Sequence, residues 1–351
     1  MNDFRQASID FLNGKLVNMG SFQYDDHLGM RNGVSTSGYK QWSEADQKRA
    51  APSQTGEQNM ASVERESAKK VAADIKRRKL LPEGLPTVEL GPGTLGAFVD
   101  QTLPIIQAFR GVACTIVDKA RRFLEKICDE ENSLGLRITP IESDFFESND
   151  RYYNEDNEAL LVMFGTISNI NASISDELPK VELVEGLKRI ANRINKGWLL
   201  LSFDSDQDGE KIKSYYQEHE LFQLNIFDRM AIEGLEEGWL DNRFDPTAFN
   251  YIAEWHPTSG QLAHTAVVNR DMTFSLNGKE VTFETGKKLH IKNSYKHTPE
   301  FFEECCKPAG LEVVEAWLDS SVKFYLLKKL MSDEVPQFNQ RSDRRLVDLR
   351  A

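Results

Sequence analysis

The feature that most constrains the fold of this chain is an apolar segment that runs directly into a glycine-rich loop. Its sequence is Thr87-Val-Glu-Leu-Gly-Pro-Gly-Thr-Leu-Gly96. The glycines of the loop let the backbone turn tightly and approach a ligand closely, and a helix expected over residues 97–109 would add its N-terminal amide groups. The pattern therefore predicts a β-strand, a ligand-binding loop and a helix, in that order.

Taken alone, the loop has three interpretations: a dinucleotide site, a site for S-adenosylmethionine (SAM) or an ordinary strand-to-helix turn. Glu89 lies just before Gly91, where its carboxylate could face the amino group of the methionine part of SAM. A pyrophosphate in the same position would be repelled by that charge. The charge therefore favours SAM. On this interpretation the cofactor contacts of the loop are Glu89, Gly91, Gly93 and Thr94.

Two further acidic residues follow strand-like segments in the same way. Asp118 ends the segment 112–117, where a carboxylate could accept hydrogen bonds from both hydroxyls of an adenosine ribose, a feature that NAD enzymes share. Asp144 and Phe145 follow the segment 136–141, where the carboxylate could bind the adenine amino group while the ring packs on the base. Strands that each end near an acid, in this order, favour a SAM site.

Strand-like and helix-like segments alternate between residues 87 and 213. The expected strands are 87–90, 112–117, 136–141, 159–164 and 198–203, and the helices between them include 119–129 and 178–195. This alternation predicts an α/β fold with a doubly wound parallel sheet. Ligands bind to such sheets beyond the carboxyl ends of the strands, so the loops after the strands should meet at one rim.

The loop after the fourth strand has the sequence Gly165-Thr-Ile-Ser-Asn169. Its small and polar residues would let a methyl donor and an acceptor come close, so Gly165 and Thr166 are expected beside the cofactor. Asn169 has two interpretations: a substrate contact, or the cap of an Asx turn that begins the next segment. The residues alone leave both open.

Residues 214–297 interrupt the alternation of strands and helices. They begin with an aromatic helix-like stretch and continue with alternating segments at 264–276 and 280–292. Asn277-Gly278 between these segments is a strong signal for a tight hairpin. An inserted antiparallel unit is therefore expected here, and it could close over the cofactor rim together with the N-terminal segment.

The segment that follows the interruption, residues 298–330, indicates the class of sheet. After a helix expected at 298–308, the runs 310–319 and 322–330 have the pattern of two strands. They predict a closing antiparallel hairpin, which methyltransferase sheets carry and NAD-binding folds generally lack.

Composition narrows the class of partner. Of the 351 residues, 40% are hydrophobic, which fits a globular protein with a large core. The formal net charge of −12 argues against a nucleic-acid surface, because phosphate binding requires clustered Lys and Arg. A small molecule is the expected partner, and the sequence does not indicate an oligomeric state.

The sequence also bears on the compartment of the protein and on metal binding. The four cysteines lack the spacing of a disulfide framework, which favours a reducing compartment. No apolar run reaches the ~18 residues of a membrane helix, and the N-terminus lacks the apolar core of a signal peptide. A soluble, cytoplasmic protein is therefore expected. The histidines are scattered without ligand spacing, so no metal site is expected.

With these residues in place, the chain resembles the SAM-dependent amino-acid N-methyltransferases. This family is typified by the histidine Nα-methyltransferase of ergothioneine biosynthesis, and fungal dimethylallyltryptophan N-methyltransferases are relatives within it. The resemblance spans residues 20–330. It rests on the motifs Phe22-Gln-Tyr-Asp25, Ser62-Val-Glu-Arg-Glu66, Val88-Glu-Leu-Gly-Pro-Gly-Thr94, Asp144-Phe145, Gly165-Thr-Ile-Ser-Asn169, Phe203-Asp204 with Asp208, and Trp317-Leu-Asp319.

The resemblance implies a class I SAM methyltransferase core, which is Rossmann-like, together with a smaller α+β substrate domain. The expected division is 1–60 for the N-terminal segment of the substrate domain, 61–213 for the SAM-binding core, 214–297 for the inserted substrate-binding part, 298–331 for the completion of the core, and 332–351 for a mobile tail.

The resemblance also implies substrate contacts. They map onto Tyr24, onto Asn169 and onto Tyr215 or Tyr216, where Asn169 and one tyrosine would hold the backbone groups of an amino acid during catalysis. This chain departs from the histidine enzymes at two places. It has Gln58-Asn59 where they have a tyrosine pair, so Asn59 would face a different pocket.

The second departure concerns the pocket for the substrate side chain. The histidine enzymes have Glu-x-Ser where this chain has Lys292-Asn-Ser294. An ammonium group repels positive charge and offers only hydrogen-bond donors, so Lys292 and Ser294 would disfavour histidine and prefer an acceptor or a negative charge. The competing interpretation of Lys292 is a solvated strand lysine.

The predicted function is a SAM-dependent N-methyltransferase that acts on a free amino acid, or on an amine derived from one, other than histidine. No general base is evident. One alternative is an NAD-dependent oxidoreductase, which the loop glycines and Asp118 would permit. The other is a non-catalytic protein that keeps the SAM-binding fold, which the altered pocket would permit.

Overall fold

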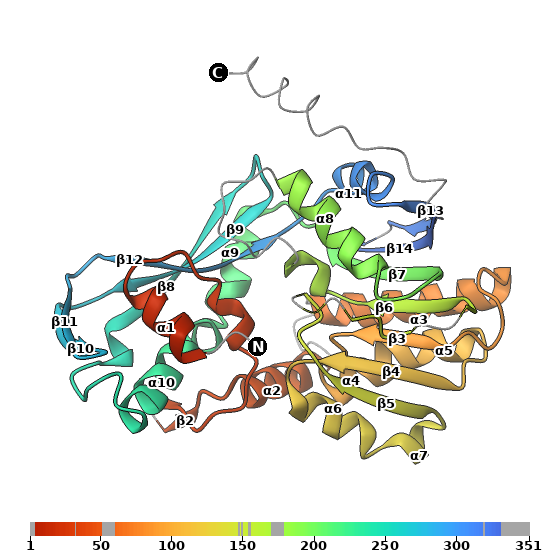
Figure 1. Cartoon of the computed structure of the whole chain (residues 1–351). Helices are drawn as coiled ribbons and strands as arrows, with labels where there is room; N and C mark the ends of the chain where they lie inside the picture. Colours follow the sequence, from red (N-terminus) through yellow and green to blue (C-terminus); the bar gives the residue numbers. More distant parts are fainter. Residues whose placement is uncertain are drawn as a thin grey trace.

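Two larger β-sheets organise the chain, and they lie in separate parts of the molecule (Figure 1). The computed structural model describes residues 4–31, 33–50, 60–146, 148, 150–153, 156–169, 179–318 and 320–330. One sheet has seven strands and the other has three. Each sheet has its own hydrophobic core, and the cores draw on different parts of the sequence.

The seven-stranded sheet contains the strand that precedes the glycine loop. In spatial order its strands are β13 (Leu311–Trp317), β14 (Val322–Lys329), β7 (Gly197–Asp204), β6 (Ala159–Met163), β3 (Thr87–Leu90), β4 (Ala113–Asp118) and β5 (Arg137–Glu142). The strands from β7 to β5 are parallel, and β14 is antiparallel to both β7 and β13. The predicted doubly wound sheet and its closing antiparallel hairpin are therefore confirmed.

Helices cover both faces of this sheet, because its central strands are apolar on both sides. In β6, Leu160 and Val162 belong to the core on one face, and Leu161 and Met163 belong to the core on the other. The helices on the first face are α3 (Met60–Arg78), α5 (Leu103–Ala108) and α6 (Arg121–Cys128), and those on the second are α8 (Pro179–Ala191) and α11 (Pro299–Cys306).

The helix that follows the glycine loop contains one wide turn. It consists of α4 (Leu95–Ala97), a π-helical turn (Phe98–Thr102) and α5. Pro104 lies in the first turn of α5, where its missing N–H group is tolerated. Wide turns of this kind are frequent at functional sites, and this one directs Thr102 toward Glu89 of the glycine-loop strand.

The three-stranded sheet is antiparallel. Its order is β12 (Lys288–Tyr295), β9 (Gln261–Val268) and β8 (Phe249–His256), and a separate hairpin consists of β10 (Met272–Leu276) and β11 (Lys279–Phe283). The hairpin turns at Asn277 and Gly278, whose φ angles are 51° and 79°. The hairpin signal is confirmed, but the strands expected over 264–276 and 280–292 are wrong in extent, because each is broken into two.

The breaks occur where Asp271 and Thr285 bind each other. Asp271 Oδ1 accepts hydrogen bonds from both the backbone N and the Oγ1 of Thr285, each at 2.7 Å. Gly286 adopts a φ angle of 89°, which glycine allows without strain. These residues let β9 and β12 pair directly while the β10–β11 hairpin extends from them as a separate unit.

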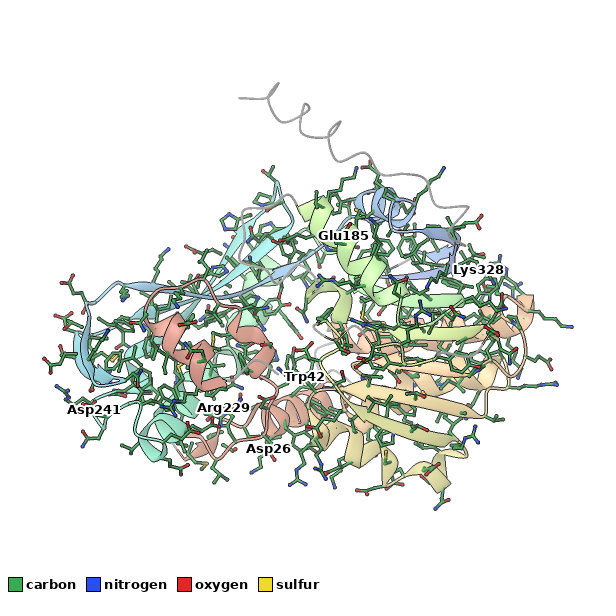
Figure 2. All side chains as sticks on the ribbon, in the orientation of Figure 1. Asp26, Trp42, Glu185, Arg229, Asp241 and Lys328 are labelled. Carbon is green, nitrogen blue, oxygen red and sulfur yellow. The ribbon has the colours of Figure 1, made fainter. Side chains whose placement is uncertain are left out.

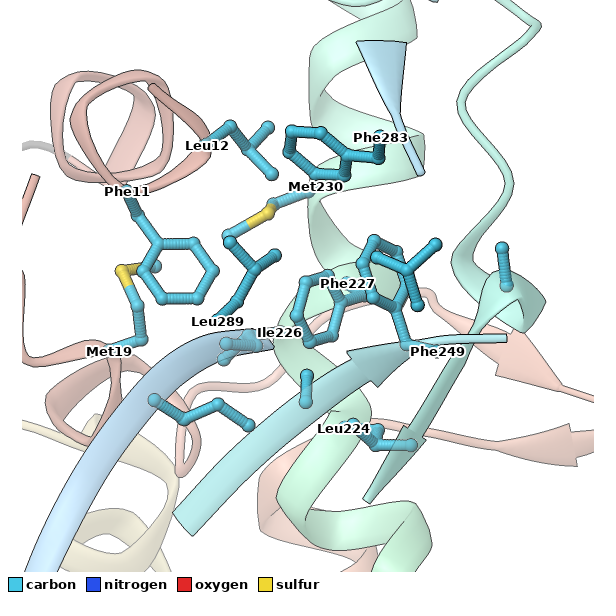
Figure 3. Close-up of a cluster of buried hydrophobic side chains, with 14 of the residues drawn as sticks. Phe11, Leu12, Met19, Leu224, Ile226, Phe227, Met230, Phe249, Phe283 and Leu289 are labelled. Carbon is cyan, nitrogen blue, oxygen red and sulfur yellow. The ribbon is translucent and has the colours of Figure 1, made fainter. Parts of the chain in front are cut away.

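The core beside the three-stranded sheet joins distant segments of the chain. α1 (Phe4–Leu12) packs against α10 (Glu220–Glu236), and Figure 3 shows Phe11 beside Phe227 and Met230. The ring centroids of Phe11 and Phe227 are 6.0 Å apart. The first helix of the chain is thus part of the same core as the strands that follow α10.

The remaining elements lie in the N-terminal segment and in the connections. They are η1 (Met19–Phe22), β1 (Met30–Arg31), β2 (Val34–Ser35), α2 (Gly38–Ala50), α7 (Glu131–Leu134), η3 (Thr166–Asn169), α9 (Gly209–Gln217) and η4 (Pro246–Ala248). The domain boundaries expected near residues 60, 213 and 297 stay a prediction, and the tail over 332–351 lies outside the described residues.

The molecule has two bodies, one built around the seven-stranded sheet and the other around the three-stranded sheet. Ion pairs hold the N-terminal segment between them. The side chains of Arg31 and Asp228 are only 8% and 3% exposed, Arg31 Nη2 lies 3.0 Å from Asp228 Oδ2, and Arg31 Nε donates to Asp228 Oδ1 at 3.2 Å. Asp26, at the junction of the two bodies in Figure 2, pairs with Arg122 of α6 at 3.3 Å. The segment therefore contacts both bodies through charged side chains.

Replacing Arg31 with methionine should leave the buried Asp228 carboxylate without its partner. We expect a loss of about 3–5 kcal/mol of unfolding free energy at about pH 8. Burial already raises the pKa of Asp228 to about 6, and the loss of Arg31 raises it further, so the carboxyl binds a proton in the folded state as the pH falls. The destabilisation should shrink between about pH 8 and about pH 5 in denaturant titrations followed by circular dichroism.

Arg110→Met is the matched control, because Arg110 pairs with Glu83 on the surface, where the two side chains are 77% and 67% exposed. That variant should lose less than about 1 kcal/mol. A loss for Arg31→Met no larger than that of the control, or one that grows as the pH falls, would contradict the assignment of a buried ion pair.

Candidate functional site

A cavity of about 300 Å³ lies between the rim of the seven-stranded sheet and the second body. Trp42 of α2 lines it and lies between the two bodies in Figure 2. The predicted site residues that line the cavity are Tyr24, Glu89, Gly91, Gly93, Asp118, Asp144, Phe145, Gly165, Thr166, Asn169, Tyr215, Tyr216, Lys292 and Ser294.

Two residues predicted for the site are not among those that line the cavity. Thr94 Oγ1 accepts a hydrogen bond from the backbone N of Ala97 at 3.1 Å, so this side chain caps α4. The cap accounts for a threonine at this position without a cofactor contact. Asn59 lies outside the described residues.

Glu89 contributes a buried carboxyl group at the end of β3. Its Oε1 accepts a hydrogen bond from Thr102 Oγ1 at 2.5 Å, whereas its buried Oε2 has no partner among the described residues. Burial raises the pKa of Glu89 to about 8, and repulsion from Asp118 adds to the shift while the bond from Thr102 opposes it. A cationic ligand group would stabilise the ionised form of this carboxyl.

The loops after β3, β5 and β6 approach one another closely at Gly91. Gly91 and Gly93 have φ angles of 70° and 65°, which favour glycine. A Cβ atom at Gly91 would lie 3.1 Å from Thr166 Oγ1 and 3.5 Å from the ring of Phe145. Small residues therefore bring these strand ends together and leave backbone groups accessible to a ligand.

Asp118 and Asp144 follow the next two strands of the sheet. Each uses one carboxylate oxygen to begin its loop: Asp118 Oδ1 accepts from the N of Ala120 at 2.8 Å, and Asp144 Oδ1 accepts from the N of Phe146 at 3.0 Å. Burial raises the pKa of Asp118 to about 7. With the ring of Phe145 in the same wall, these acceptors suit a ligand with hydroxyl groups and a flat ring.

Aromatic rings form much of the opposite wall. The rings of Tyr24, Trp42 and Phe222 contact one another, with centroids 5.2 to 5.6 Å apart. Tyr215 and Tyr216 are in T-shaped contact at 5.2 Å, and both line the cavity. Both tyrosines that the sequence offered as alternatives therefore reach the same space.

Lys292 is buried in this wall, so its interpretation as a solvated lysine is wrong. Only 7% of the residue is exposed, and its Nζ donates to Gln23 Oε1 at 2.5 Å. The amide of Gln23 cannot turn around, because its Nε2 donates to the carbonyl of Gln223 at 2.8 Å. Burial lowers the pKa of Lys292 to about 7.

A β-bulge turns Lys292 and Ser294 toward the cavity. The register between β12 and β9 shifts so that Lys292 lies opposite His264 and Ile291 has no partner. Side chains alternate between the two faces of a strand, so one extra residue exchanges the faces of all later residues. Leu289 in the hydrophobic core and Lys292 in the cavity wall thereby share one face of the sheet.

Comparison with known proteins identifies the family. Residues 60–329 match the model of the histidine-specific, SAM-dependent methyltransferases. The chain belongs to this family. An uncharacterized protein of Sinorhizobium fredii, y4iF, is 35% identical to this methyltransferase over 300 residues, which are 81% of this chain and 96% of that protein.

Solved structures align with this chain at lower sequence identity. A SAM-dependent methyltransferase of Clostridium acetobutylicum has 12% identity and a TM-score of 0.44, covering 84% of this chain and 99% of its own. The magnesium protoporphyrin IX methyltransferase of Synechocystis, crystallised with bound SAH, has 13% identity and a TM-score of 0.43, covering 83% and 94%.

The cofactor of this methyltransferase is SAM, and the residues at the rim fit it. The free oxygen of Glu89 suits the ammonium group of the cofactor, and Asp118 suits its ribose hydroxyls. An NAD-dependent oxidoreductase is not favoured, because the family match supports SAM.

Four charged residues of the cavity wall were not among the predicted site residues, namely Glu64, Lys119, Asp204 and Lys296. Glu64 Oε1 accepts from Ser202 Oγ at 2.5 Å, and burial raises the pKa of this carboxyl. Asp204 forms a buried ion pair with Lys296, with Nζ 2.6 Å from Oδ2. Glu64 and Asp204 lie within motifs that carry the family resemblance, which could have indicated them, whereas Lys296 lies in none.

The described residues contain no group of His, Cys, Asp and Glu side chains arranged to hold a metal ion. Among the described helices, none combines the length and the apolar character needed to cross a membrane.

Replacing Asp118 with alanine should weaken SAM binding, because the ribose hydroxyls lose a charge-assisted acceptor. We expect a loss of about 1.5–3 kcal/mol of binding free energy, measured by isothermal titration calorimetry, in a variant that keeps its fold. The matched control is Glu142→Ala, because Glu142 is the register partner of Asp118 on β5 but is exposed. Equal SAM affinity in the two folded variants would remove Asp118 from the cofactor site.

Proposed function

We propose that this methyltransferase transfers a methyl group to the amine nitrogen of a free amino acid, or of a small amine derived from one, and that histidine is not the preferred substrate. The observation that carries the proposal is the continuous cavity, in which the cofactor end at Glu89 and the residues Asn169, Tyr216 and Lys292 share one space. A cavity of this size suits a small molecule.

The chemistry requires the protein to orient an amine and to exclude water. When bound, SAM supplies the electrophilic methyl group. Asn169 lies in η3, immediately after the loop residues Gly165 and Thr166, and its amide offers both a donor and an acceptor to an amino acid's backbone groups. The rings of Tyr24 and Tyr216 limit the water in the cavity and reduce the freedom of the substrate.

The charge of the far wall supports a substrate other than histidine. Lys292 stands where the resembling histidine enzymes have a glutamate. Its ammonium form offers only donors, and an anionic substrate group beside it would favour that form over the neutral amine. A cationic side chain would be repelled there, whereas a carboxylate or a carbonyl oxygen would be bound. The buried setting makes the preference strong, because a mismatched substrate would leave Lys292 without a partner on its cavity side.

Replacing Asn169 with alanine should spare SAM binding and reduce methyl transfer by roughly tenfold to a hundredfold, because the substrate loses its orientation. Calorimetry with SAM and a mass-spectrometric methylation assay on the same preparation separate the two effects. Unchanged turnover together with unchanged substrate KM would favour the turn-capping interpretation of Asn169.

The specificity prediction is tested with a panel of amino acids and their derivatives. The wild-type enzyme should methylate substrates with a distal acceptor or negative charge in preference to histidine, arginine and lysine. Lys292→Met should raise the KM of the preferred substrate by roughly tenfold and leave the SAM affinity unchanged.

Lys288→Met is the matched control, because Lys288 lies on the same strand but is exposed and pairs with Glu254 at 2.7 Å. It should behave like the wild type. Efficient methylation of histidine by the wild-type enzyme, or an unchanged substrate preference in Lys292→Met, would refute this account of the pocket.

A further inference from the structure

The cavity wall at Ser294 is backed by a chain of buried hydrogen bonds. Tyr251 Oη lies 2.7 Å from His264 Nδ1, and His264 Nε2 lies 3.0 Å from Ser294 Oγ. The three residues come from β8, β9 and β12 of one sheet, and none is more than 3% exposed. Of the three, only Ser294 lines the cavity.

The surroundings of His264 favour its neutral form. It is fully buried, and Lys292 lies directly opposite it in the register of β9 and β12. Burial, followed by repulsion from Lys292, His290 and Lys296, holds the pKa of His264 well below its ordinary value. A neutral imidazole has one N–H group, so one ring nitrogen donates a hydrogen bond and the other accepts one.

Tyr251 decides which nitrogen accepts. Among the described residues, the partner of the Tyr251 hydroxyl is His264 Nδ1 and no other. If Nδ1 carried the imidazole proton, the phenol proton of Tyr251 would be buried without an acceptor, which is unfavourable. The hydroxyl therefore donates to Nδ1, and Nε2–H donates to Ser294 Oγ.

The direction of these bonds determines what Ser294 offers to a ligand. Its oxygen already accepts from His264, and among the described residues it has no second partner. Its own hydrogen is therefore available to the cavity. Lys292 lies two positions earlier on the same face of β12, at a spacing of about 7 Å. Both groups can therefore donate a hydrogen bond into the cavity, and together they favour a ligand oxygen that accepts both bonds.

We propose that Tyr251 and His264 are positioning residues that set Ser294 as a donor, and that Ser294 and Lys292 together form a subsite for a carboxylate on the distal end of the substrate. The inference rests on the proposed function, since it names the class of amine that the same cavity takes. A distal ammonium or imidazole N–H group could not accept the hydrogen bonds that Ser294 and Lys292 donate.

The tautomer of His264 tests the Tyr251–His264–Ser294 hydrogen-bond relay without reference to any substrate. Nitrogen-15 NMR of the full chain labelled at histidine should show Nδ1 without a proton and Nε2 with one, and the signal is assigned by its loss in His264→Phe. A protonated Nδ1 would overturn the relay, whether or not the enzyme methylates amino acids.

Selectivity tests the subsite. The wild-type enzyme should prefer glutamate to 2,4-diaminobutyrate, which ends in an ammonium group. In Tyr251→Phe the imidazole is free to accept from Ser294, so the ratio of kcat/KM for these two substrates should fall by roughly tenfold. A purely structural role for Tyr251 would lower both values alike, and that result would overturn the proposal.

Tyr325→Phe is the control for the loss of a buried phenol hydroxyl. The hydroxyl of Tyr325, on β14, donates a hydrogen bond to Glu303 of α11 at 3.0 Å, away from the cavity. This variant should therefore keep the wild-type ratio. If the wild-type enzyme methylates neither glutamate nor other substrates with a distal carboxylate, the subsite is refuted. The tautomer result then still decides the relay.

Discussion

The cavity wall at Lys292 depends on Gln23, because this residue joins three segments that are far apart in the sequence. Its amide donates to the carbonyl of Gln223 and accepts from Lys292, while its backbone carbonyl accepts from Asn225 Nδ2 at 2.7 Å. A Cβ atom on Gly38 would lie only 1.6 Å from that carbonyl oxygen, so the surrounding backbone packs tightly. Moving Gln23 would leave several buried polar groups unpaired, so the N-terminal segment is a fixed part of the wall.

The two ends of the cavity differ in the charge that they offer. The rim of the seven-stranded sheet presents the carboxyl groups of Glu89 and Asp118, whose pKa values burial raises to about 8 and about 7. The opposite wall presents Lys292, while Lys296 is neutralised by Asp204. The positively charged groups of SAM suit the first end. The second end suits an anionic group, and under the proposed function this polarity would orient the substrate.

The cofactor half of the cavity could be anticipated because its signals are local. Three apolar strands each end near an acid, and the first runs into a glycine loop. The carboxyl ends of parallel strands must meet at one rim. The cofactor contact of Thr94 stays a prediction, and its hydroxyl also caps α4 by accepting a hydrogen bond from the backbone N of Ala97. The extents of the strands over 264–276 and 280–292 could not be anticipated, because the break depends on a bond between Asp271 and Thr285 across a chain reversal.

By itself the sequence determined the doubly wound sheet and its closing hairpin and favoured SAM over NAD, because periodicity and the order of strands and acids are properties of neighbouring residues. Only the tertiary structure decided which way Lys292 and Ser294 point, since one bulge in β12 selects the face of every later residue. The burial of Lys292 likewise depends on Gln23, which is 269 positions away in the chain. Such contacts follow from the packing of distant segments, for which adjacent residues carry no signal.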